Sequence, residues 1–138
     1  MNVAEIVKEI HETNKSKGFW DKDRNIGELL MLTVSELSEA LEAHRGRGNK
    51  LNKEYFDLFV NSSSSIGTKS DDGETITKET LFKDGFKLYV KDSFEDEIAD
   101  AIIRLFDLCG GLEIDIEWHI EQKLKYDKTR ERMHGKKY

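Results

Sequence analysis

Two acidic pairs limit what this chain of 138 residues can fold into more than any other feature, because each pair lies inside an apolar run. The pairs are Glu36 with Glu39 and Glu97 with Asp100. Residues three apart lie on one face of a helix, so each pair presents its carboxylates together. Packing the two helices against each other would gather four negative charges, which cations would have to neutralise. The sequence therefore predicts paired helices that carry an acidic cluster.

The first pair gives the stronger case when its helix is drawn as a wheel. Glu36 falls inside the apolar arc, whereas Glu39 falls at the edge of that arc. An ionised carboxylate that faces a core costs roughly several kcal/mol unless a partner compensates it. Glu36 is therefore predicted to point inward toward a compensating cation. Taken alone, Glu39 is better explained as an edge residue paired with Lys or Arg.

The second pair is more ambiguous. On its helix Glu97 lies at the margin of the apolar arc and Asp100 lies one step further out. Arg104 follows Asp100 by four residues, which is the spacing of an ordinary helical ion pair. Taken alone, Asp100 is better explained as the partner of such a pair. Only the combination of both acidic pairs favours a metal site.

Composition predicts one compact domain, which we expect to be soluble and cytoplasmic. A single cysteine, Cys109, excludes an intramolecular disulfide framework and suggests a reducing compartment. Neither a signal-peptide pattern nor a run of apolar residues long enough for a membrane span occurs. The net charge of −6 combines a basic tail, residues 123–138 at +5, with an acidic remainder at −11. This asymmetry suits a small anion bound with metal ions and argues against polymeric nucleic acid.

Apolar periodicity predicts helices over about residues 2–17, 25–45 and 94–111. The segment from Arg45 to Asn49 gives the stop signal of the second helix, and the third is expected to begin at Ser93 as N-cap and to end at Gly110-Gly111. The last element, from about residue 114, fits a strand by its even apolar spacing and a helix by its composition. Residues 50–92 differ from the rest, with loop sequences at 61–65 and 71–73. Lys83-Asp84-Gly85, between two short apolar runs, predicts the turn of a small hairpin.

The residues that carry a family resemblance stand in order along the chain. They are Gly18-Phe19-Trp20, then Arg24 to Leu29, then Ser35 to Glu42, then Glu97 to Asp100 as an ExxD motif, then Lys123, Arg130 and His134 to Tyr138. In this order they resemble the MazG-like all-α nucleoside triphosphate pyrophosphohydrolases, over roughly residues 3–49 and 93–138. The resemblance implies an all-α, MazG-like four-helix bundle in a single domain, 1–138. It favours a helix for the last element and makes residues 50–92 an inserted loop or small hairpin.

The resemblance also implies an activity, the hydrolysis of (deoxy)nucleoside triphosphates to the monophosphate and pyrophosphate, as nucleotide-pool housecleaning by a homodimer or homotetramer. Carboxylates without histidines suit Mg²⁺, with Mn²⁺ as an alternative. The expected metal ligands are Glu36, Glu39, Glu97 and Asp100, and Glu36 or Glu39 would also orient or deprotonate the attacking water. The expected substrate contacts are Lys123, Arg130, Asp127, Lys136 and, as a platform for the base, Trp20.

The chain departs from the family pattern at three points. Ser35 replaces the first Glu of the family's EExxE motif, Asp127 replaces a common Asn, and the two acidic motifs are unusually far apart. Simpler interpretations also stay open, since Trp20 could be a hydrophobic plug and Lys123 could only pair with Asp127. A ferritin-like di-iron bundle is disfavoured because it needs two Glu-x-x-His motifs, and this chain has only one, Glu131-Arg-Met-His134. The alternative function is a non-catalytic helical interaction protein whose acidic cluster is mere surface.

Overall fold

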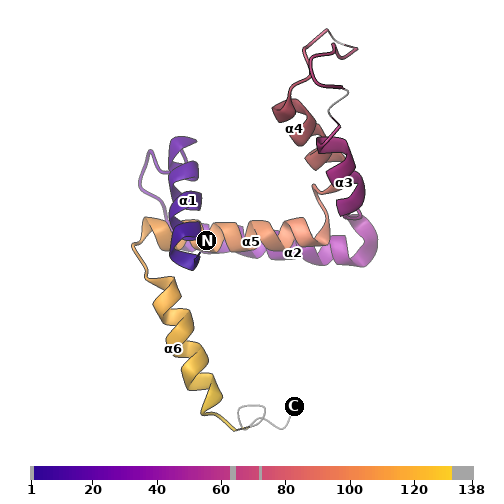
Figure 1. Cartoon of the computed structure of the whole chain (residues 1–138). Helices are drawn as coiled ribbons and strands as arrows, with labels where there is room; N and C mark the ends of the chain where they lie inside the picture. Colours follow the sequence, from indigo (N-terminus) through magenta and orange to yellow (C-terminus); the bar gives the residue numbers. More distant parts are fainter. Residues whose placement is uncertain (1, 63–64, 72, 132–138) are drawn as a thin grey trace. The chain divides into compact units, whose positions relative to one another are not determined.

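The computed structural model describes residues 2–62, 65–71 and 73–131, and within them the chain is helical without any named strand. This confirms the predicted all-α class. The helices, labelled in Figure 1, are α1 (Val3–Ser16), α2 (Ile26–Glu42), the π-helical turn η1 (Ala43–Arg47), α3 (Lys53–Val60), α4 (Lys78–Tyr89), α5 (Phe94–Gly111) and α6 (Ile116–Lys128). None of these helices is long and apolar enough to span a membrane.

The chain divides into two compact units, which are described separately. Unit 1 consists of Met1–Leu30 with Ile103–Tyr138, and unit 2 consists of Met31–Ile102. The division falls inside α2 and inside α5, so each of these helices contributes residues to both units.

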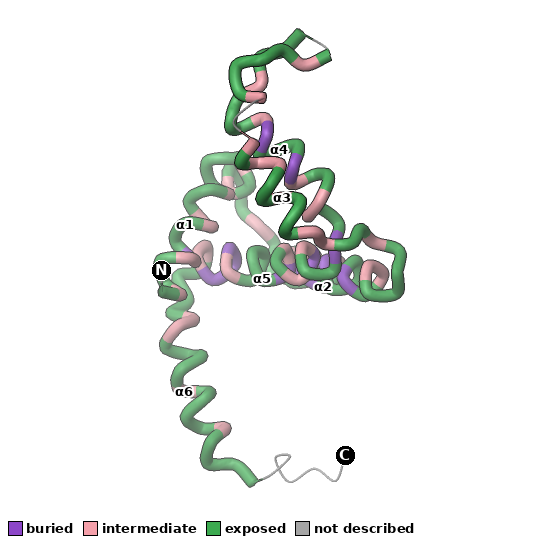
Figure 2. Tube along the Cα trace, turned by 45° about the vertical axis from the view of Figure 1, so that its right-hand side comes forward, coloured by how far each residue is buried: buried purple, intermediate pink, exposed green. Residues whose placement is uncertain are grey.

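Unit 1 is built from α1, the following loop, the start of α2, the end of α5, and α6. Asn2 caps α1 by accepting a hydrogen bond from the backbone N–H of Glu5, and the Glu5 side chain accepts one from the N–H of Asn2 in return. Gly18, at φ +84°, takes the left-handed conformation just after α1. The last element is a helix, as the resemblance implied, and Asp115 caps its first turn. Figure 2 shows α6 exposed along most of its length.

Unit 2 contains the second part of α2 and the first part of α5, which lie side by side in both views (Figures 1 and 2). Ala40 of α2 and Ala101 of α5 are buried. Ser93, which is fully buried, begins α5 as predicted, because its hydroxyl accepts a hydrogen bond from the N–H of Asp96.

The predicted hairpin between residues 80 and 90 is wrong, because this segment forms helix α4. Thr77 caps α4 together with Thr80, and Gly85 lies in the middle of the helix where a turn was predicted. A Cβ atom on Gly85 would lie 3.0 Å from Phe59 and 3.1 Å from Val60, so this glycine allows α3 to approach α4 closely. The glycine therefore serves helix packing and not chain reversal.

Aromatic side chains hold α3 and α4 together. Tyr55 stacks on Tyr89 at a centroid distance of 6.0 Å, and Phe59 meets the same Tyr89 edge-on at 5.8 Å. In the described part of the loop between the two helices, an antiparallel bridge joins Lys69 to Thr75. The predicted loop sequences at 61–65 and 71–73 fall in this region, and their residues 63–64 and 72 lie outside the described residues. The segment between η1 and α5 thus contains a pair of helices, α3 and α4, joined by a loop.

Candidate metal centre

Three carboxylates from two helices come together in unit 2. Glu36 of α2 and Glu97 and Asp100 of α5 each offer an oxygen, and these oxygens all lie within 4.8 Å of one another. Sixty residues of sequence separate Glu36 from Glu97, so only the pairing of α2 with α5 creates the cluster. We call these three residues the carboxylate cluster.

Two members of the carboxylate cluster are buried. Glu36 is 6% exposed, which confirms that it points inward, and Glu97 is also 6% exposed. Glu97 is thus more deeply buried than its place at the margin of the helical wheel predicted. The reason is that α2 covers this margin, and a wheel drawn for α5 alone does not include that neighbour. Asp100 is the more exposed member.

Burial and like charge act together on Glu97. Burial raises the pKa of the Glu97 carboxyl, and the negative charges of Glu39, Asp100 and Glu36 raise it further. Both effects disfavour the ionised form of Glu97. A cation bound among these oxygens would relieve both, because it would compensate the lost hydration and the repulsion at once.

Glu39 does not belong to the carboxylate cluster but lines a cavity beside it. This cavity, of about 300 Å³, is lined by Ser38, Glu39, Glu42, Ala43, Arg47, Gly48, Asp92 and Glu97. Glu97 therefore belongs both to the carboxylate cluster and to the cavity wall. Glu39, which is exposed, remains close enough for its charge to act on Glu97.

Sequence reasoning missed the basic side of this cavity. Arg47 forms a close ion pair with Glu42, and Arg45 donates to the other oxygen of Glu42 at 3.0 Å. The sequence from Arg45 to Asn49 was interpreted only as the stop signal of a helix. The signal that could have revealed the site is the pair of arginines, Arg45 and Arg47, less than three helical turns after Glu39.

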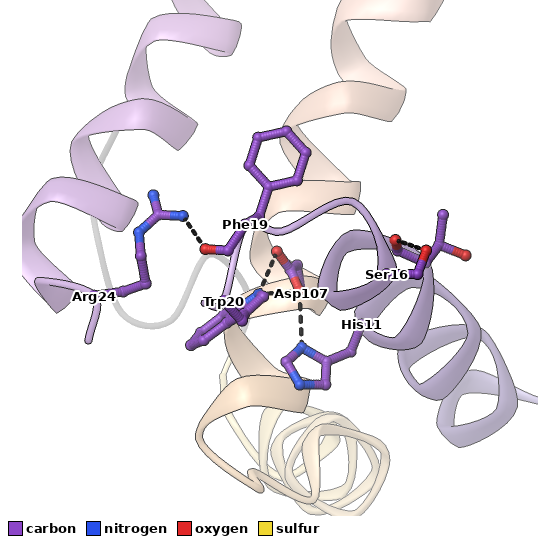
Figure 3. A network of polar contacts seen from close by, with 7 residues as sticks. His11, Ser16, Phe19, Trp20, Arg24 and Asp107 are labelled. Carbon is purple, nitrogen blue, oxygen red and sulfur yellow. Dashed lines mark hydrogen bonds and ion pairs between the residues drawn. The ribbon is translucent and has the colours of Figure 1, made fainter. Parts of the chain in front are cut away.

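Unit 1 contains a separate polar network, shown in Figure 3. Asp107, which is buried, contacts His11 Nδ1 at 2.9 Å and accepts hydrogen bonds from the indole N–H of Trp20 at 2.9 and 3.1 Å. The Trp20 ring packs so tightly on α5 that a Cβ atom on Gly111 would lie 2.1 Å from it. These contacts are those expected of a hydrophobic plug, the simpler interpretation of Trp20. Asp107 was missed, although it is an acid inside an apolar run.

A cavity of about 540 Å³ lies next to this network. Its lining includes His11, Cys109 and residues from the start of α6. Burial raises the pKa of the Cys109 thiol, so the side chain stays protonated and packs as a small hydrophobe.

The basic residues predicted to contact phosphate pair with an acid in α6. Lys123 Nζ lies 2.6 Å from Asp127 Oδ1, and Arg130 lies 3.8 Å from the same oxygen. The simple ion pair of Lys123 with Asp127 is therefore present. Lys136, with the rest of the tail from residue 132, lies outside the described residues.

Comparison with known proteins finds no matching family model, no matching curated protein and no matching solved structure. By its fold and site, the chain is an all-α protein with a carboxylate cluster of which two of the three members are buried, and hard divalent cations prefer oxygen donors of this kind. The resemblance to the MazG-like family rests on the sequence motifs.

Proposed function

We propose that this protein is a MazG-like pyrophosphohydrolase, which uses Mg²⁺ to hydrolyse (deoxy)nucleoside triphosphates to the monophosphate and pyrophosphate. The observation that carries the proposal is the carboxylate cluster, with three oxygens within 4.8 Å. Glu36 and Glu97 are buried, where an ionised carboxylate is costly, and a bound cation would compensate part of that cost. The choice of the bond that is cleaved rests on the resemblance alone.

The donor set fits Mg²⁺ or Mn²⁺. All donors in the carboxylate cluster are carboxylate oxygens, and neither histidine nor cysteine belongs to it. When bound, such an ion would neutralise the phosphates, polarise the α-phosphorus and lower the pKa of a coordinated water. Glu36, Glu97 and Asp100 would hold the ion, and Glu39 would complete the set from the edge of the neighbouring cavity.

Further roles follow from the family. Glu36 or Glu39 would orient or deprotonate the attacking water, and Lys123 and Arg130 would bind phosphate oxygens after giving up their contacts with Asp127. The base would stack on Trp20 or on its neighbour Phe19, whose side chain is 57% exposed. The bundle would be of the MazG-like four-helix type.

We also propose a homodimer or homotetramer. Within unit 2, α2 presents Val34, Leu37 and Leu41 at 47%, 49% and 47% exposure. These residues follow one another at helical spacing, so they form one apolar stripe that a second copy could cover. The same stripe also favours the alternative function, a non-catalytic interaction protein. The two functions differ in whether Mg²⁺ stabilises the fold.

The decisive experiment is a panel of ribo- and deoxynucleoside triphosphates, tested with Mg²⁺ and with Mn²⁺. Pyrophosphate and monophosphate are measured separately, and both should appear in equal amounts. Glu36→Gln should abolish the activity, whereas Glu28→Gln, a change at an exposed position on the same helix, should leave it intact. Orthophosphate as the first product would reject the assigned bond, and inactivity with every nucleotide would favour the interaction protein.

A further inference from the structure

The cavity beside the carboxylate cluster brings a cation close to the proposed metal ligands. Of the described residues that line it, Arg47 is the only basic one, and it shares the cavity wall with Glu39 and Glu97. Arg47 lies at the end of η1, where Gly46, at φ +86°, takes a left-handed conformation that suits glycine. The chain thus turns directly after α2 and places a guanidinium next to the acidic motif.

The wall of this cavity is held in place by contacts between distant segments. The backbone N–H of Asn49 donates to the carbonyl of Asp92 at 2.9 Å, and the Asn49 amide donates to the carbonyl of Lys91 at 2.8 Å. A Cβ atom on Gly48 would lie 2.5 Å from the Ala43 Cβ and 2.6 Å from the Asp92 carbonyl oxygen. Gly48 therefore permits a close approach that joins the segment after η1 to the start of α5.

The charges of the cavity decide which ligand it can accept. Glu39, Glu42, Asp92 and Glu97 outnumber the single Arg47, so the lining repels a free anion. Divalent cations at the carboxylate cluster would offset most of this negative charge. A metal-bound polyphosphate would then fit, because its remaining negative charge could face the guanidinium.

Arg47 is available for such a contact. Its side chain is 73% exposed, and its ion pair with Glu42, itself 39% exposed, is of the solvent-accessible kind that contributes little to stability. Glu42 keeps Arg45 as a second partner when Arg47 leaves. A guanidinium can donate two parallel hydrogen bonds to two phosphate oxygens at once. Such a bidentate contact is at least as favourable as the exposed ion pair with Glu42.

We propose that Arg47 binds the phosphate chain of the metal-bound nucleoside triphosphate, exchanging Glu42 for phosphate oxygens. This inference rests on the proposed function and adds a substrate-binding residue that the family resemblance does not supply. The contact is made to phosphate, so it is independent of the base. It also requires the divalent ion, since the acidic lining excludes the nucleotide without it.

The test measures binding by isothermal titration calorimetry with the full chain and Mg²⁺. The probes are the α,β-imido analogues of dATP, dGTP, dCTP and dUTP, which bind without being cleaved. The variants are Arg47→Ala and Arg45→Ala, a matched pair because both arginines contact Glu42 but only Arg47 lines the cavity. Circular dichroism and thermal unfolding establish that both variants fold as the wild type does.

We expect Arg47→Ala to weaken binding roughly ten- to a hundredfold, by a similar factor for each analogue that binds, through the loss of charge-assisted hydrogen bonds. Arg45→Ala should change the affinity by less than about threefold, as expected for an exposed ion pair. If the wild type binds an analogue but the two variants are equal, the role of Arg47 is refuted while the proposed function survives. If the wild type binds none of the four with Mg²⁺, the proposed function itself fails.

Discussion

The substitution Glu36→Gln tests whether the carboxylate cluster exists to hold a metal ion. Glutamine keeps the size of the side chain and one carbonyl oxygen but removes the negative charge. In the metal-free protein this removes the repulsion between Glu36 and its two neighbours, Glu97 and Asp100. In the presence of Mg²⁺ it removes a ligand. The same change should therefore stabilise the metal-free protein and abolish stabilisation by the metal.

The separation of the oxygens sets the size of both effects. Two unit charges 4.8 Å apart repel by about 3 kcal/mol at an effective dielectric constant of about 20. Partial protonation, favoured by the raised pKa of Glu97, and the solvent near Asp100 reduce this repulsion. We expect the metal-free variant to gain roughly 1–3 kcal/mol. For the wild type, Mg²⁺ at about a hundred times its Kd adds about 2.7 kcal/mol, which corresponds to roughly 10 °C in Tm.

The assay is thermal and urea unfolding at pH 7, first in EDTA and then across a Mg²⁺ titration. NaCl of matched ionic strength separates specific binding from general screening of the repulsion. Glu28→Gln serves as the control, because it removes a charge from an exposed position of the same helix.

Two results would contradict this reasoning. A wild type whose Tm does not respond to Mg²⁺ would leave the carboxylate cluster without a metal, as in a non-catalytic interaction protein. A Glu36→Gln variant that keeps the full Mg²⁺ response would show that the ion binds elsewhere. A gain in stability without metal does not by itself discriminate, because both functions predict it.

Three further predictions concern other parts of the molecule. Because the folded state raises the pKa of Glu97, it binds the proton more tightly than the unfolded state does. In EDTA, the stability that this group contributes should be present below the ordinary glutamate pKa and be lost as the pH rises through the raised value, and Glu97→Gln should remove this loss in urea unfolding followed across pH. Gly111→Ala should cost about 1–3 kcal/mol in urea unfolding, because the new methyl group would overlap the Trp20 ring; a cost below about 0.5 kcal/mol would refute this packing. Leu37→Lys should reduce the assembly to a monomer in sedimentation analysis while the fold is kept, and an unchanged mass would exclude this stripe as the interface.

The helix ends show which parts of this fold can be predicted from the local sequence. Ser93 before Phe94, and the glycines at 110–111, predicted the bounds of α5 closely, because a cap and a stop act within one helical turn. The helical wheel also placed Glu36 inward correctly, because the apolar residues around it have to face the protein interior and carry Glu36 with them.

Other features depended on partners that are distant in sequence. Gly85 was interpreted as part of a turn because Lys-Asp-Gly is a common turn sequence, but contact with Phe59 and Val60 gives it a place inside α4. The helix or strand choice for α6 was equally undecided by spacing alone. At Gly85 the local turn preference gives way to contacts with α3, whereas α6 buries no residue, so its helix follows from its helix-forming composition and the Asp115 cap.

The amino-acid sequence by itself determined that this protein is helical, that Glu36 points inward and that acids recur at helical spacing in two apolar runs. Only the tertiary structure decided that Glu97 is buried, that Glu36, Glu97 and Asp100 share one cluster, and that Arg47 lines the cavity beside it. The physical reason is the distance along the chain over which each effect acts. Periodicity and capping act over a few residues, whereas burial and electrostatic coupling depend on which other segment packs against each face.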